Sequence, residues 1–109
     1  MFKITPNPTF EIDVLVHVPG AETPGTIRFT FKYLNPEQLK KWQADQGNNS
    51  VNDALQEIAL GWSGVETSAG EQVPFSKENL TTLLETYHSA GEEITRAYLA
   101  EIFGAKRKN

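Results

Sequence analysis

The sequence contains no cysteine and no long hydrophobic run. The absence of cysteine excludes disulfides, thiolate zinc sites and a cysteine nucleophile. The densest apolar patch, Val14-Leu15-Val16, ends at His17, far short of the roughly 20 residues that a membrane-spanning helix needs. Residues 1–6 show no apolar region of the kind found in secretory signal peptides. We therefore expect an intracellular, soluble protein that has no membrane partner.

Basic residues are scarce in the second half of the chain. Residues 50–105 contain nine acidic residues and only two basic ones, Lys77 and Arg96, whereas residues 106–109 contain three basic ones. Nucleic-acid-binding proteins usually present a basic face to the phosphates. The acidic block would repel them, so no nucleic-acid partner is predicted.

The length of 109 residues, with 39% hydrophobic residues and eleven aromatic ones, is typical of one folded domain. We predict a single α+β domain over residues 1–105, followed by a basic tail over residues 106–109. Apolar residues alternate with polar ones over residues 10–18 and again over residues 26–33, around a loop rich in proline and glycine. This pattern predicts an antiparallel β-hairpin.

The parity of the two apolar faces restricts how the two strands can pair. The apolar positions are even-numbered in the first strand and odd-numbered in the second, and directly opposed residues share a face. A register that places Val16 opposite Ile27 and Glu11 opposite Lys32 satisfies both the apolar match and the charge match. Phe2 and Ile4 alternate around Lys3 and predict a short third strand. The other edge of the hairpin would remain open to a partner strand or to self-association into a homo-oligomer.

From residue 35 onward the pattern is helical, and cap residues predict four short helices packed on the hairpin. Asn35 with Pro36 and Gln38 predicts a capped start, and Ser89 with Glu92 predicts a capping box. The four predicted helix starts are Asn35, Ser50, Ser76 and Ser89. The predicted ends include Gly47, Gly61 and Gly104, and residues 61–74 are expected to form a loop.

No pattern in the sequence predicts catalysis or metal binding. Gly61-Trp62-Ser63-Gly64-Val65 departs from the nucleophile elbow because Val65 stands where glycine is required. His17 and His88 lie far apart and have no metal-ligating partner at helical spacing. The acidic residues of the helices are explained by helix caps and solvated faces. We therefore predict no catalytic residue, no metal and no cofactor.

An ordered set of motifs resembles one protein family over nearly the whole chain. The most specific part is Gly61-Trp62-Ser63-Gly64-Val65 followed by Pro74-Phe75-Ser76-Lys77-Glu78-Asn79-Leu80, with Tyr87 and Ala97-Tyr98-Leu99 in the last two helices. In this order the chain resembles the phage tail assembly chaperones of siphovirus-type tailed phages and prophages. The positions that carry the resemblance are Gly61, Trp62, Gly64, Val65, Phe75, Ser76, Leu80, Tyr87 and Tyr98.

The resemblance implies a non-enzymatic role. Proteins of this family bind the tape measure protein and help the tail tube protein to assemble around it. They act in the cytoplasm of the bacterial host and are absent from the mature virion. The motif residues are expected to be structural, with Trp62, Phe75 and Tyr98 in the core. The alternative is a small regulatory or antitoxin-like protein-binding module from a mobile element.

Overall fold

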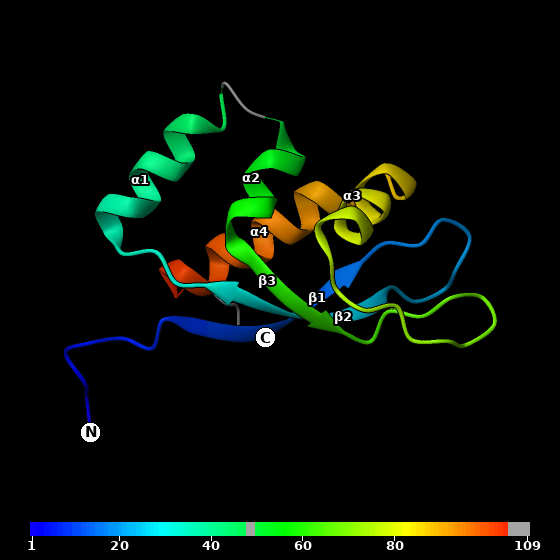
Figure 1. The fold of residues 1–109 in the computed structure, drawn as a ribbon, viewed down its shortest axis with the longest axis horizontal. Helices are drawn as coiled ribbons and strands as arrows, with labels where there is room; N and C mark the ends of the chain where they lie inside the picture. Colours follow the sequence, from blue (N-terminus) through cyan, green and yellow to red (C-terminus); the bar gives the residue numbers. More distant parts are fainter. Residues whose placement is uncertain (48–49, 105–109) are drawn as a thin grey trace.

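A computed structural model describes residues 1–47 and 50–104, and its fold is an α+β arrangement of one antiparallel sheet and four helices. The helices lie together on one face of the sheet (Figure 1). The predicted fold class is therefore confirmed. The elements are β1 (Thr9–Val16), β2 (Gly25–Lys32), α1 (Pro36–Asp45), α2 (Val51–Ile58), β3 (Ala59–Ser63), α3 (Lys77–Thr86) and α4 (Ala90–Phe103).

The alternation in β1 and β2 sorts their side chains between the core and the solvent. Val14, Ile27 and Phe29 are buried beneath the helices, whereas Asp13 and Arg28 are exposed on the opposite face. The predicted parity of the pairing is confirmed, but the predicted register is wrong by two residues. Val14, not Val16, lies opposite Ile27, and Asp13 lies opposite Arg28.

The first strand also ends earlier than its sequence pattern suggests. The backbone N–H of His17 donates to both carboxylate oxygens of Glu93 in α4, at 3.0 and 3.2 Å. The predicted pairing of Glu11 with Lys32 is replaced by Arg28, which contacts Glu11 at 3.3 Å and Asp13 at 3.0 Å.

The third strand is β3, and not the N-terminal segment. Residues 1–8 belong to no helix or strand, and Phe2 and Ile4 are each 93% exposed. The predictions that Gly61 ends a helix and that a loop begins there are also wrong, because α2 ends at Ile58 and the chain continues directly into β3. Since β2 is paired with β1 on one side only, its other edge needs hydrogen-bond partners, and β3 supplies them.

The cap residues predict the helix starts well, with one exception. Asn35 and Gln38 form the expected capping box, and the hydroxyls of Ser50 and Ser76 accept the N–H groups three residues on. Ser89 does not cap α4 with its side chain, which instead donates to Glu93 at 2.8 Å. The predicted box of Ser89 with Glu92 is therefore wrong, because Glu93 takes the serine hydroxyl.

The C-terminal end of α4 follows the prediction. Gly104 adopts a left-handed conformation with φ of 68° and ends the helix, a geometry that glycine adopts without strain. The predicted basic tail, residues 106–109, lies outside the described residues. Among the helices of the described part of the chain, none is long and apolar enough to cross a membrane.

Candidate functional site

The first motif residues form an aromatic cluster beside β3. Trp62 lies opposite Phe29 in the sheet, and the two rings meet edge-on with centroids 5.8 Å apart. Phe75 meets Trp62 edge-on from the other side at 5.2 Å. The indole N–H of Trp62 donates to the backbone carbonyl of Val73 at 2.8 Å. Trp62 is thus half-buried against the core and holds the segment between β3 and α3 in place.

The neighbouring motif residues shape the turn that follows β3. Gly64 has a φ of 89°, a left-handed conformation that other residues rarely adopt. The carbonyl of Val65 accepts the N–H of Val73 at 2.8 Å and closes the turn. Tyr87 is half-buried and lines the same shallow groove as Gly64 and Val65. These three residues lie together, but their role is to fold the chain.

Two further motif residues secure α3. The hydroxyl of Ser76 accepts the N–H of Asn79 at 3.0 Å, and Leu80 is fully buried in the core. Both positions therefore define where the helix begins and how it packs.

Tyr98 is the centre of a second aromatic cluster, beneath β1 and β2. Its buried ring lies with its centroid 5.0 Å from that of Phe31, 5.6 Å from that of Trp42 and 5.7 Å from that of Phe10. Its hydroxyl donates to the backbone carbonyl of Lys32 at 2.9 Å. Burial raises the pKa of the Tyr98 phenol, and the nearby phenol of Tyr33 raises that pKa further.

The polar candidates do not come together into a reactive site. His17 and His88 are both exposed, and His17 contacts Glu93 through its backbone N–H. Ser63 is exposed at the end of β3, and Glu92 pairs with Arg96 at 2.6 Å on the surface of α4. Within residues 1–47 and 50–104, no three histidine or acidic side chains are grouped as metal ligands. The geometry offers surfaces for binding.

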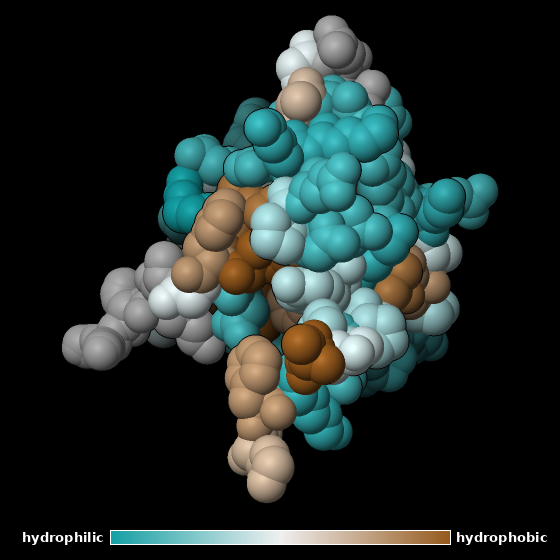
Figure 2. Space-filling model, turned by 90° about the vertical axis from the view of Figure 1, so that its left-hand side faces the viewer, coloured by the Kyte–Doolittle hydropathy of each residue, from teal (hydrophilic) through white to brown (hydrophobic). Residues whose placement is uncertain are grey.

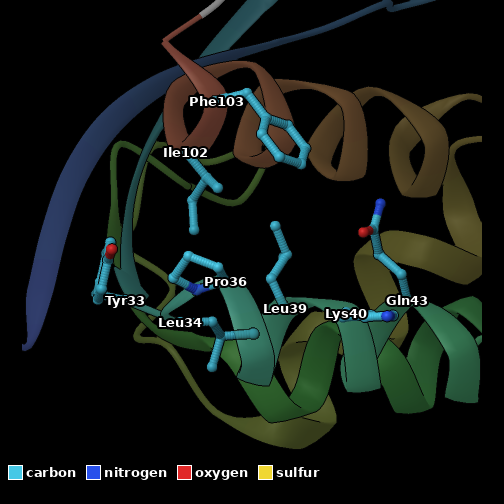
Figure 3. Close-up of a pocket in the computed structure, with 8 residues that line it drawn as sticks. All are labelled: Tyr33, Leu34, Pro36, Leu39, Lys40, Gln43, Ile102 and Phe103. Carbon is cyan, nitrogen blue, oxygen red and sulfur yellow. The ribbon is translucent and has the colours of Figure 1, made fainter.

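One such surface is a groove between the start of α1 and the end of α4, with a volume of about 210 Å³. In Figure 3 the side chains of Leu39 from α1 and Ile102 from α4 point toward each other across the gap. Phe103 stands beside them and is 63% exposed. The lining residues are Tyr33, Leu34, Pro36, Leu39, Lys40, Gln43, Ile102 and Phe103.

The groove is mainly apolar, and Lys40 is the charged residue in its lining. Figure 2, which faces this end of the molecule, shows hydrophobic surface gathered there and again on the N-terminal segment below it. Exposed apolar surface of this kind marks sites where another protein binds. This groove is the candidate functional site.

The sequence predicts the two helices that form the groove, but it does not predict that they lie side by side. In the sequence, Leu34 and Leu39 have the spacing of a hydrophobic staple, and Ile102 lies on the apolar stripe of the last helix. The useful signal is Phe103, an aromatic residue just outside the stripe that faces the core. Leu39 and Ile102 are more than sixty positions apart in sequence, so no local pattern joins them.

Comparison with known proteins gives one match. The family model described as phage tail assembly chaperone matches residues 1–109, which is the whole chain. Neither a curated protein nor a solved structure matches the chain.

Proposed function

Because the chain belongs to the phage tail assembly chaperone family, we propose that it binds the tape measure protein and keeps it soluble while the tail tube assembles around it. The tail tube protein is the second proposed partner. The role is non-enzymatic and is carried out in the cytoplasm of the bacterial host, so the protein is absent from the finished virion. The family match over the whole chain favours this role over that of an antitoxin-like module.

The observation that supports this proposal is the groove between α1 and α4. A tape measure protein is long and helical, and its helices expose apolar stripes before assembly. Apolar helix faces bind in apolar grooves through residues spaced three and four positions apart. Phe103 and the half-buried Ile102 would contact such a stripe, with the buried Leu39 beneath them, and Lys40 would pair with an acidic residue beside it.

The proposal is tested by co-expression with the tape measure protein from the same genome. We expect the tape measure protein to move into the soluble fraction with the wild-type chain. Phe103→Ala should weaken binding at least tenfold, which corresponds to about 1.4 kcal/mol, because it removes the most exposed aromatic ring of the groove. The matched control is Leu60→Ala, since Leu60 in β3 is 49% exposed and does not line the groove.

Two outcomes would contradict the proposal at different levels. If the tape measure protein stays insoluble with this chain but becomes soluble with another neighbouring gene product, the chaperone role is wrong. If Phe103→Ala and Leu60→Ala bind the tape measure protein equally well, the role stands but the groove is not the binding site.

A further inference from the structure

The strand β1 forms one edge of the sheet, because the strand order is β1-β2-β3. In an antiparallel pair, successive residues direct their backbone N–H and C=O groups alternately toward the partner strand and away from it. The N–H of Tyr33 donates to the carbonyl of Pro8 at 2.8 Å, which fixes the phase of this alternation. The backbone N–H and C=O groups of even-numbered β1 residues therefore point toward β2, and those of odd-numbered residues point outward from the edge of the sheet.

The outward-facing backbone groups of β1 belong to Thr9, Glu11, Asp13 and Leu15. In the part of the chain that the structure describes, no hydrogen bond is made to the N–H groups of these four residues. The next outward N–H is that of His17, and the carboxylate of Glu93 accepts it. Glu93 of α4 thus occupies one end of the edge. The outward-facing backbone groups of the four β1 residues remain available to a partner strand.

A groove of about 440 Å³ runs along this edge. Its lining includes Ile12 from the core face of β1, Glu11 and Asp13 from the outer face, and Ala97 and Ala100 from α4. Residues from both faces of one strand line a single groove only where that groove follows the edge of the strand. The two alanines are small, so α4 leaves space beside the edge instead of filling it.

The charge of the edge groove indicates which strand would bind there. Glu11 and Asp13 are acidic, and among the described residues of the lining Arg28 is the basic one. Arg28 is engaged by both Glu11 and Asp13. The groove therefore has a net negative charge and favours a basic partner.

The same charges disfavour a second copy of the chain. Two β1 strands that pair antiparallel at this edge would form hydrogen bonds through the backbones of their odd-numbered residues. The side chains of these residues all lie on the outer face of the sheet. The two registers with the greatest overlap place Glu11 opposite Asp13, or Asp13 opposite Asp13, of the other copy. Like charges directly opposed in a sheet are destabilising.

We propose that the edge of β1 binds an extended segment of a partner protein that carries lysine or arginine at every second position. The basic side chains lie over the outer face, opposite Glu11 and Asp13. The alternate side chains are small and apolar and face Ala97 and Ala100. This site is separate from the groove between α1 and α4, so it does not depend on the proposed tape measure binding.

The test uses a blocked octapeptide in which lysine alternates with valine, and it follows amide hydrogen exchange by NMR. In the free protein the N–H groups of Ile12 and Val14 should exchange slowly, and those of Glu11 and Asp13 rapidly. Added peptide should slow exchange at Glu11 and Asp13 at least tenfold and leave Ile12 and Val14 unchanged. A peptide in which glutamate alternates with valine should bind at least tenfold more weakly.

A second pair of peptides tests the strand pairing itself. One carries methyl groups on the backbone nitrogens of its lysines, and the other on those of its valines. Only one of these two sets can face β1, so one peptide should lose binding and the other should keep it. Equal binding of both, or no slowing at Glu11 and Asp13, overturns the proposal. Slow exchange at these residues without peptide, increasing with protein concentration, would show that a second copy occupies the edge.

Discussion

At the scale of single residues, Tyr98 combines two roles that are separable by mutation. Its ring packs against three other aromatic rings, and its hydroxyl donates a hydrogen bond to a backbone carbonyl. That carbonyl belongs to Lys32, which lies at the end of β2 beyond the residues that β3 pairs with. The sheet therefore leaves this acceptor unpaired, and the phenol of α4 satisfies it.

Tyr98→Phe should lower the free energy of unfolding by about 1–2 kcal/mol, because it leaves the Lys32 carbonyl without its partner while preserving the ring packing. Urea denaturation measures the change. Tyr87→Phe is the matched control, since Tyr87 is only half-buried, and it should change stability by no more than about 0.5 kcal/mol. Equal effects of the two variants would show that the hydroxyl contact of Tyr98 is unimportant.

Because the pKa of Tyr98 is raised in the folded protein, the difference in stability between the wild type and Tyr98→Phe should depend on pH. A phenol whose pKa is higher in the folded state stabilises the fold below its unfolded pKa of about 10, and this stability is lost as the pH rises above that value. The wild type should therefore lose more stability at alkaline pH than Tyr98→Phe does. Parallel pH dependences would contradict the assignment.

At the scale of elements, one carboxylate connects the last helix to the first strand. Glu93 accepts the N–H of His17 and the hydroxyl of Ser89. The adjacent Glu92 forms an exposed ion pair with Arg96 of the same helix. Glu93 therefore connects α4 to β1, whereas Glu92 pairs with a residue of its own helix.

Glu93→Ala should destabilise the protein by about 1.5–3 kcal/mol, since it removes charged hydrogen bonds that tie α4 to β1. Glu92→Ala should cost less than about 1 kcal/mol, as expected for an exposed ion pair. Thermal unfolding of the two variants measures the difference, and both share any interaction with the helix dipole. If Glu92→Ala is the more destabilising variant, Glu93 does not set the end of β1.

This carboxylate also shows where sequence-based prediction of the elements ends. The alternation of Val14, Ile27 and Phe29 is a local property, so it predicts the two strands and which of their faces is buried. The alternation does not fix the register, and the contact of His17 with Glu93 at the end of β1 joins residues 76 positions apart. No local pattern contains that contact, and a register two residues away satisfies the alternation equally well.

β3 was missed for a related reason. Ala59 continues the apolar stripe of α2, and a strand of five residues is too short for its alternation to be recognised. Gly61 looks like a helix stop, whereas in the sheet it lies opposite Thr30, with β2 close by. The strand exists because β2 needs a second partner, which is a property of the whole sheet.

At the scale of the whole molecule, the exposed side chains proposed for binding, such as Phe103, lie outside the buried core, although Leu34 and Leu39 of that core also line the groove. The groove between α1 and α4 was not predictable, because it arises where Leu39 and Ile102 meet across the packed elements. Of the three aromatic residues that the family resemblance placed in the core, Tyr98 is fully buried, whereas Trp62 and Phe75 are only partly buried against it. Folding and binding should therefore respond to different mutations.

The N-terminal segment provides the sharpest test of that separation. Phe2 and Ile4 are apolar yet almost fully exposed, and residues 1–8 form no helix or strand. Pro8 must be kept, because its carbonyl accepts the N–H of Tyr33. Deleting residues 2–7 should therefore change the free energy of unfolding by no more than about 0.5 kcal/mol.

The same deletion should reduce binding of the tape measure protein, since Phe2 and Ile4 are exposed apolar side chains of the N-terminal segment, whose hydrophobic surface lies below the groove (Figure 2). Urea denaturation measures the first effect, and soluble yield of the co-expressed tape measure protein measures the second. The double variant Phe2→Ser with Ile4→Ser should reproduce the deletion, because the apolar side chains and not the chain length are responsible. A loss of stability greater than about 1 kcal/mol would show that the segment packs on the fold, and unchanged binding would restrict the client surface to the groove itself.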